Sequence, residues 1–289
     1  PDYTIILAAD HIYKMNYARL IEHHVENQAD MTVGALRVPV AEAACQFGVM
    51  EIDTESRVVG FEEKPPQPKS IPGDSNIALA SMGIYVFKYD VIEKVLGEDV
   101  SHLDFGKEVI PAALHNYNVQ AYLFNGYWED IGTIAAFYKA NLDMTSAIPP
   151  FNLFDAEAPL FTRARYLPPS KMDNCELSDS IISEGCIING AKINRSVIGL
   201  RSRIGEGTQI DSAYMMGADY YQTLEDLVAD REAKRPRVGI DERTVIRRAI
   251  IDKNARIGKD VRLLNESGVE NADGPNGMYY IRDRIIIVP

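Results

Sequence analysis

Two carboxylates in the first half of the chain stand where a strand is predicted to end or a helix to begin. Asp10 follows the apolar run Ile5–Ala9, which is typical of a buried strand, and Asp130 precedes a predicted helix. Ligands of open α/β sheets collect at the carboxyl ends of strands, and paired carboxylates can hold Mg²⁺ against phosphate oxygens there. A strand-end cap at Asp10 and a helix N-cap at Asp130 are the structural alternatives. For a lone Asp10 the strand-end cap would ordinarily be favoured, whereas for the pair of carboxylates the residues leave metal binding and capping about equal.

Two further segments carry groups suited to a phosphorylated sugar. In Phe61–Pro65, Glu63 is suited to accept hydrogen bonds from sugar hydroxyls and Lys64 to neutralise a phosphate. In Ala80–Tyr85, Ser81 is placed to bond a ligand hydroxyl. A solvated turn and ordinary strand packing are the structural alternatives, and the Ser81 segment is the weaker signal.

Other chemistries find less support. His23 and His24 are adjacent on a predicted helix, so they face in different directions and do not form an i, i+4 metal pair. The chain has no Cys-x-x-Cys, no Walker loop and no Ser-His-Asp order. The sugar-phosphate interpretation therefore has no rival of equal quality.

Composition excludes several classes of protein. The 289 residues are 46% hydrophobic and carry a formal charge of −12, so a nucleic-acid backbone would be repelled by the chain as a whole. No apolar stretch is long enough to span a bilayer, and no signal segment opens the sequence. Three scattered cysteines predict a reducing, cytoplasmic location rather than a disulfide framework or a zinc site.

The first half alternates strand and helix patterns, which predicts a largely parallel sheet covered by helices. The expected strands are 4–9, 31–38, 49–52, 58–61, 79–87 and 119–124. The expected helices are 17–29, 91–96, 106–116 and 133–144. A segment rich in proline and aromatic residues follows. We predict a first domain over 1–147, a linker over 148–170 and a second domain over 171–289.

The second domain shows a period of six instead. Aliphatic residues recur at that spacing, and small or turn-forming residues follow many of them: Ile181, Ile187, Ile193; Ile198, Ile204, Ile210, Met216; Ile240, Ile246; Ile251, Ile257, Leu263. This spacing predicts a parallel β-helix in which each aliphatic side chain stacks on its counterpart one coil away. A sandwich of short strands would show a period of two. The charged segment 214–237 interrupts the repeat and predicts a loop with one helix over 223–234.

Six motifs follow one another in the first half: Leu7–Met15, Phe47–Met50, Glu63–Pro65, Ser81–Tyr85, Asp104–Lys107 and Tyr127–Thr133. In their order and spacing they together resemble the glucose-1-phosphate adenylyltransferase family, also called ADP-glucose pyrophosphorylase. The likeness extends into the second half, where Met216–Tyr221 and Ile251–Gly258 are similar to the cyanobacterial and plant branch of that family. The resemblance implies an incomplete Rossmann-like α/β nucleotidyltransferase domain followed by a left-handed parallel β-helix for regulation and oligomerisation.

The resemblance also implies a reaction and a set of roles. ATP and α-glucose 1-phosphate would give ADP-glucose and pyrophosphate, for glycogen or starch synthesis. Asp10 and Asp130 would hold Mg²⁺, with Asp10 the main catalytic acid. The sugar phosphate would be bound by Gly48, Glu63, Lys64, Ser81, Tyr85, Asp104 and Trp128. Lys253 would belong to a site for small allosteric effectors, although an exposed turn lysine is an equal alternative, and the subunits would form homo- or heterotetramers.

The chain also departs from the family pattern. Ala9 replaces the usual glycine, and the glycine-rich phosphate loop and a second activator lysine are expected outside the segment Pro1–Pro289. The resemblance therefore implies a chain truncated at both ends that does not turn over by itself. Another sugar-1-phosphate nucleotidyltransferase and a non-catalytic regulatory subunit are the main alternatives. A β-helix acyltransferase is disfavoured, because no histidine follows His115. A plant source would place the protein in the plastid.

Overall fold

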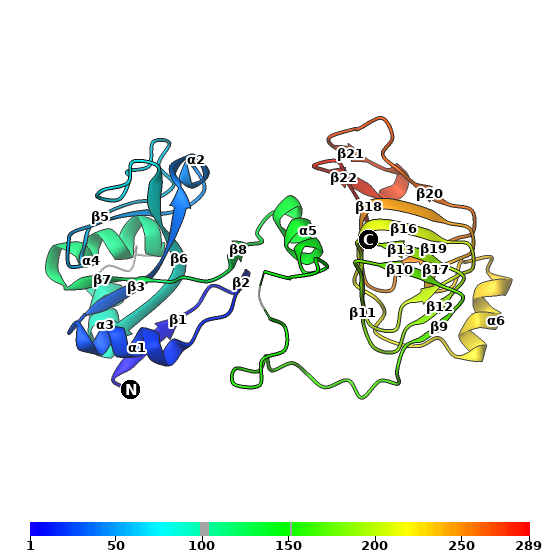
Figure 1. Cartoon of the computed structure of the whole chain (residues 1–289), viewed down its shortest axis with the longest axis horizontal. Coiled ribbons are helices and arrows are strands. Elements are labelled where there is room, and N and C mark those ends of the chain that lie inside the picture. Colours follow the sequence, from blue (N-terminus) through cyan, green and yellow to red (C-terminus); the bar gives the residue numbers. More distant parts are fainter. Residues whose placement is uncertain (99–103, 151) are drawn as a thin grey trace. The chain divides into compact units, whose positions relative to one another are not determined.

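The computed structural model describes residues 1–98, 104–150 and 152–289 (Figure 1). Residue 151 of the predicted linker lies outside this range. The chain forms two compact units, Pro1–Trp128 and Glu129–Pro289. The first is a mixed sheet with helices, and the second is built mainly from short parallel strands.

The first unit has a six-stranded sheet in the order β5-β4-β6-β3-β7, with β1 also pairing with β6. Its strands are β1 (Tyr3–Ile6), β3 (Met31–Pro39), β4 (Val49–Ile52), β5 (Val58–Glu62), β6 (Ile77–Lys88) and β7 (Val119–Leu123). The expectation of a largely parallel sheet is wrong, because β6 runs antiparallel to β1, β3 and β4. The strands from β4 to β6 follow one another without a crossover helix, and such connections join antiparallel neighbours.

The two faces of β6 build two separate cores. Met82, Ile84 and Val86 alternate along the strand and pack with Leu20 of α1 (Tyr17–Glu26). The opposite face of the sheet packs against α3 (Tyr89–Glu98) and α4 (Ile110–Asn116) through Phe87 and its neighbours. The helices therefore cover both faces, as expected, even though the strand directions differ.

The helix ends follow local capping chemistry. Asn16 caps α1 by accepting a hydrogen bond from Ala18 N–H at 3.0 Å. The helix ends at Glu26 rather than at the expected residue 29, since Gln28 adopts a left-handed backbone. A π-helical turn, η1 (Phe105–Val109), opens the predicted helix 106–116, and the one-turn helix α2 (Val40–Ala43) lies outside the sequence prediction.

Helix α5 (Ile134–Asp143) belongs to the second unit. The Tyr138 hydroxyl donates a hydrogen bond to the Ser212 carbonyl at 2.6 Å, and Leu142 packs with Ile250 and Ile285. The spatial division therefore precedes the sequence boundary predicted at residue 147. Its position is set by the apolar side of α5, which packs on the coils that follow the linker.

The second unit winds into a parallel β-helix. Its strands are β9 (Lys171–Asp173), β10 (Glu176–Ser178), β11 (Ile181–Ile182), β12 (Ile187–Asn189), β13 (Lys192–Asn194), β14 (Val197–Ile198), β15 (Arg203–Ile204), β16 (Gln209–Met215), β17 (Gly239–Ile240), β18 (Val245–Ile251), β19 (Arg256–Ile257) and β20 (Arg262–Leu263). Each described pairing between strands of successive coils is parallel. An antiparallel end follows, formed by β21 (Ala272–Asp273), β22 (Tyr280–Arg282) and β23 (Ile285–Val288), with the short 3₁₀ turn η2 (Pro275–Gly277).

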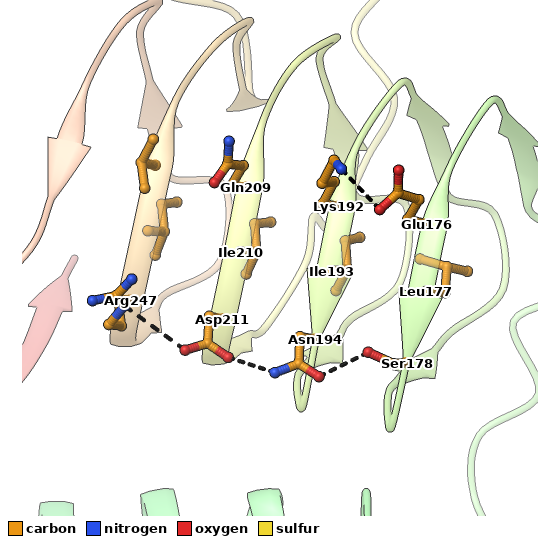
Figure 2. A pocket seen from close by; sticks show the side chains of 12 residues that line it. Glu176, Leu177, Ser178, Lys192, Ile193, Asn194, Gln209, Ile210, Asp211 and Arg247 are labelled. Atoms are coloured by element: carbon orange, nitrogen blue, oxygen red, sulfur yellow. Dashed lines mark hydrogen bonds and ion pairs between the residues drawn. The ribbon is translucent and has the colours of Figure 1, made fainter.

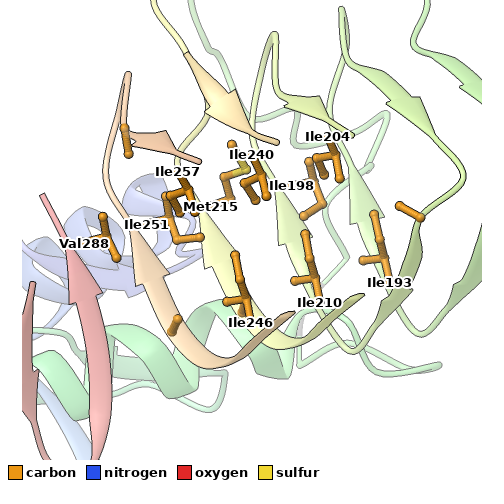
Figure 3. Packing of buried hydrophobic residues seen from close by; sticks show 14 of the residues in the cluster. Ile193, Ile198, Ile204, Ile210, Met215, Ile240, Ile246, Ile251, Ile257 and Val288 are labelled. Atoms are coloured by element: carbon orange, nitrogen blue, oxygen red, sulfur yellow. The ribbon is translucent and has the colours of Figure 1, made fainter. Parts of the chain in front are cut away.

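The interior of the β-helix is the predicted stack of aliphatic side chains. Figure 3 shows how the side chains of successive coils stack on one another. Ile204, Ile240 and Ile257 form one column through directly paired positions. The strict period of six is wrong at three positions, because Ile182, Ile188 and Met215 take the paired interior places rather than Ile181, Ile187 and Met216.

The interior positions depart from a strict period of six because successive buried residues are separated by either five or six residues. Ile188, Ile193 and Ile198 are five residues apart, whereas Ile198 and Ile204 are six apart, and all are at most 2% exposed. The period of six therefore identifies the architecture but misplaces individual side chains.

The interruption of the repeat begins after Met215, because Tyr214 still belongs to β16. It contains α6 (Leu224–Glu232), with a capping box between Thr223 and Asp226, as the prediction of a helix over 223–234 anticipated. Asp230 of α6 is buried and bonds to Arg256 at 2.5 Å. None of the helices in the described ranges has the length and apolarity required to traverse a lipid bilayer.

Candidate functional site

Glu63 is the centre of a cluster of predicted site residues in the first unit. Its half-buried carboxylate follows β5 and lies against two glycines. A Cβ atom on Gly48 would stand 2.8 Å from Glu63 Oε2, and a Cβ atom on Gly106 would stand closer still. Both glycines therefore allow the backbone to approach this carboxylate.

The ionisation of Glu63 is shifted by these surroundings. Burial is the main cause that raises its pKa, and the nearby negative charge of Asp104 adds to the rise. Lys64 and Lys107 act in the opposite direction. The carboxylate is thus close to charges of both signs.

Asp104 is itself fixed as the cap of η1. Its Oδ1 accepts hydrogen bonds from Gly106 N–H at 2.9 Å and Lys107 N–H at 3.0 Å. The bond from Lys107 N–H is the main reason that the pKa of Asp104 lies below its ordinary value. The cap therefore holds the Gly106 backbone in the place where it meets Glu63.

Ser81 and Tyr85 reach the same cluster from β6. Ser81 N–H donates to the Gly48 carbonyl at 2.8 Å, and the Ser81 side chain bonds Tyr85. The ring of Tyr85 stacks on Phe105 of η1 with centroids 5.2 Å apart. Burial raises the pKa of Tyr85, and the Glu63 and Asp104 charges reinforce this, so the phenol stays neutral and can donate a hydrogen bond.

Lys64 lies next to this cluster with an exposed side chain. Its backbone is left-handed, with φ at +48°, and its N–H donates to the Phe47 carbonyl at 3.1 Å. A non-glycine residue in this region costs of order 1–3 kcal/mol, and many turn residues of the second unit adopt the same conformation. The turn directs the chain away from β5 immediately after Glu63.

Asp10 lies outside the regular sheet. β1 ends at Ile6 rather than at the expected residue 9, so Asp10 belongs to a bend before β2 (His11–Tyr13). Its side chain is 65% exposed, and Oδ1 stands 3.8 Å from His11 Nε2. An exposed carboxylate of this kind offers the hard oxygen atoms that Mg²⁺ requires.

Asp130 is the last residue of β8 (Trp128–Asp130) and accepts a hydrogen bond from Gly132 N–H at 2.8 Å. It does not cap α5, because Thr133 does so through Ala136 N–H. Asp130 and Asp10 fall in different compact units, so their pairing stays a prediction. Within the described ranges, no three or more His, Cys, Asp or Glu side chains gather closely enough to hold a metal ion.

Trp128 lies near the Asp10 bend and contacts the residue that follows Asp10. It is 8% exposed and contacts the rings of His11 and Phe47 edge-on, with centroids 5.0 and 5.4 Å apart. Sequence reasoning assigned no separate role to His11, Phe105 or Gly106. Each lies inside a motif that also contains a predicted site residue, and this is the signal by which it could have been found.

Lys253 lies in a different place, on the β-helix. It borders a cavity of about 680 Å³ that is also lined by Arg163, Arg165 and Arg201. Lys253 Nζ stands 3.1 Å from Asp219 Oδ1. Hydrogen bonds from the Asn254 and Lys253 side chains lower the pKa of the Asp219 carboxyl. Four cations and one anion at a single cavity make an electropositive site.

A second hollow of about 570 Å³ lies on the outer face of β10, β13, β16 and β18 (Figure 2). Its polar groups bind one another along the coils. Ser178 donates to Asn194 at 2.8 Å, Asn194 donates to Asp211 at 2.7 Å, and Lys192 pairs with Glu176 at 2.9 Å. This ladder ties successive coils together.

Comparison with known families matches both halves of the chain. Residues 1–147 match the family model described as nucleotidyl transferase. Residues 165–289 match the model described as GLGC left-handed parallel beta-helix domain. This order of domains is the architecture of sugar-1-phosphate nucleotidyltransferases, and it identifies the coils of the second unit as left-handed.

Proposed function

Because the chain belongs to the nucleotidyl transferase family, we propose that its activity is transfer of the adenylyl group of ATP to α-D-glucose 1-phosphate, giving ADP-glucose and pyrophosphate. The observation that carries the proposal is the convergence of Gly48, Glu63, Ser81 and Asp104 in the first unit. Such a product supplies glycogen or starch synthesis. The adenylyl specificity is supported by the GLGC-type β-helix domain beside it.

The sugar end of the substrate fits the Glu63 cluster. An ionised Glu63 accepts hydrogen bonds from glucose hydroxyls, while Ser81 and the neutral Tyr85 phenol donate or accept in the same place. Gly48 lets the backbone come close to the Glu63 carboxylate, and Trp128 and Asp104 would lie near the bound sugar. Lys64 supplies a positive charge for the sugar phosphate.

The chemical step needs little from a base. A phosphate oxygen of glucose 1-phosphate attacks the α-phosphorus of ATP, and the bond from that phosphorus to the departing pyrophosphate breaks. Because the attacking oxygen is already anionic, positioning and charge neutralisation do most of the work. Asp10 and Asp130 would hold Mg²⁺, whose bound charge would offset that of the phosphates. The carboxylate chemistry of both residues suits that ion.

Regulation belongs to the same proposal. The cavity at Lys253 has the charge and size to bind small phosphorylated effectors. Assembly into a homo- or heterotetramer, through a domain built of flat faces, would place several such sites in one molecule. We propose no role in binding nucleic acid or membranes.

The test measures binding of the sugar phosphate separately from turnover. Calorimetry with glucose 1-phosphate should give saturable binding to the purified chain that glucose 6-phosphate and mannose 1-phosphate do not match. Glu63→Gln, which keeps the size of the side chain, should weaken that binding by roughly ten- to a hundredfold, the cost of a hydrogen-bonded charged group. Equal binding of all three sugars would contradict the proposal.

Two turnover measurements, made on the full-length assembly, decide between the alternatives. Pyrophosphate release with ATP, UTP, dTTP and GTP in turn identifies the nucleotide, and a preference for UTP, dTTP or GTP would favour another sugar-1-phosphate nucleotidyltransferase. Asp10→Asn should abolish release. Undiminished release would point instead to a regulatory subunit within an active assembly.

A further inference from the structure

The bend that carries Asp10 lies between two short strands. β1 makes its last pair between Ile6 and Tyr85, and β2 begins at His11. The Asp10 side chain itself is 65% exposed. Some other contact must fix the position of this carboxylate if it is to act on a substrate.

His11 makes the contact that joins the bend to β6. Its side chain is 13% exposed, and Nδ1 stands 2.9 Å from the Met82 carbonyl oxygen. A carbonyl oxygen only accepts hydrogen bonds, so Nδ1 must carry the proton. The Nε2 atom on the other side of the ring then lies toward Asp10, at 3.8 Å from Oδ1.

The slot for this ring is shaped on two sides. Gly83 of β6 has φ at +66°, and a Cβ atom there would stand 3.3 Å from His11 Cε1. Trp128 meets the ring edge-on at an interplanar angle of 81°. Gly83 therefore leaves room for the imidazole on one side, and the buried Trp128 side chain contacts it on the other.

We propose that His11 is a positioning residue, whose Nδ1–H bond to Met82 holds the Asp10 carboxylate where the proposed reaction needs it. The inference rests on the proposed function only for the role of Asp10 as a ligand of Mg²⁺. Residues that orient a metal ligand commonly contribute about ten- to a hundredfold to metal affinity. His11 itself touches neither substrate nor metal in this proposal.

The first experiment reads the tautomer directly. Nitrogen NMR of the whole chain should show His11 protonated at Nδ1, which is the minor tautomer of free histidine. A His11 ring protonated only at Nε2 would overturn the proposal, whatever the protein catalyses.

The second experiment uses amide side chains that imitate one ring nitrogen each. His11→Asn places an N–H donor near the position of Nδ1, whereas His11→Gln places it near Nε2. Mn²⁺ alone serves as a paramagnetic probe in place of Mg²⁺. Its approach is followed by broadening of the indole signal of Trp128, the one tryptophan in the sequence.

The expected order of affinity separates positioning from general damage. The Mn²⁺ concentration for half-broadening should rise about tenfold in His11→Gln and stay within about threefold of wild type in His11→Asn. Equal losses in both variants, at equal melting temperature, would overturn the proposal.

Asp10→Asn separates this inference from the proposed function. Unchanged Mn²⁺ binding in Asp10→Asn would remove the metal role of Asp10. The positioning claim would then be judged by hydrogen exchange at the amides of residues 9 and 10, which should be faster in His11→Gln than in His11→Asn. Equal exchange in the two variants would overturn it.

Discussion

The carboxylate of Glu63 lies against the backbone of Gly106, so closely that no other residue type fits at that glycine without moving the carboxylate. Two segments more than forty residues apart in the sequence therefore meet at one polar point. Gly106 lies in the first turn of η1, where the Asp104 cap fixes it. The arrangement makes the position of Glu63 sensitive to a single methyl group.

Substitution of Gly106 should therefore impair the sugar site with little effect on the fold. Gly106→Ala displaces the Glu63 carboxylate, and misplacement of a binding group by about 1 Å can cost up to about a hundredfold. Calorimetry with glucose 1-phosphate measures the loss. Gly97→Ala is the matched control, because nothing lies within 4 Å of a Cβ atom there. Similar affinities for the two variants would show that Glu63 does not depend on Gly106.

Glu63→Gln should separate stability from binding. The pKa of Glu63 is raised by burial and by Asp104, so the folded state binds more protons than the unfolded state from pH 4.5 upward to the raised value. Stability due to Glu63 is therefore lost as the pH rises through that window. At pH 7 the glutamine variant should be more stable in urea than wild type while it loses sugar binding. Lower stability would show that the carboxylate is stabilised by contacts in the folded state.

A buried histidine should make the first unit sensitive to acid. His24 is fully buried, its Nδ1 lies 2.8 Å from Thr32 Oγ1, and burial lowers its pKa from 6.5 to about 4. The folded state then binds fewer protons than the unfolded state between these values. Stability is full above pH 6.5 and falls by roughly 3 kcal/mol as the pH approaches 4.

Urea unfolding followed by Trp128 fluorescence measures this loss, since that tryptophan reports on the first unit. In His24→Gln, the free energy of unfolding should depend less on pH between 6.5 and about 4. His115→Gln is the control, because His115 is exposed. An unchanged slope in His24→Gln would assign the acid sensitivity to other groups.

Two adjacent isoleucines, Ile187 and Ile188, test which position of β12 is interior in the β-helix. Ile188→Ala removes a side chain that is 0% exposed and should cost about 2–5 kcal/mol. Ile187→Ala removes its half-buried neighbour and should cost about 1 kcal/mol. Thermal unfolding by circular dichroism compares them. A larger loss at Ile187 would restore the strict six-residue register.

The basic cavity predicts anion binding that depends on Lys253. Lys253→Gln should weaken binding of inorganic phosphate severalfold, with a smaller salt dependence, because one of the four cations is lost. Lys259→Gln removes an exposed lysine that pairs with Glu242 at 3.0 Å outside the cavity, and should leave binding unchanged. Calorimetry at two salt concentrations makes the comparison. Equal loss in both variants would indicate a general charge effect.

Much of the architecture could be predicted from local patterns. The helix α6 and its capping box follow from Thr223 and Asp226, which lie three residues apart and need no distant contact. The parallel β-helix follows from a repeat, because each coil buries its aliphatic residues only on the next coil. Strand direction in the first sheet could not be predicted, since alternation of element types does not say which edge of β6 each strand joins.

The sequence by itself determined the types of residue available for chemistry: Asp10, Glu63, Lys64, Ser81 and Asp130 each carry a group whose reactivity is intrinsic. Only the tertiary structure decided which of them meet. The raised pKa of Glu63 arises from burial and from Asp104, and its position depends on two glycines from other segments. Such effects depend on distance and on exclusion of water, and both are set by long-range packing rather than by local sequence.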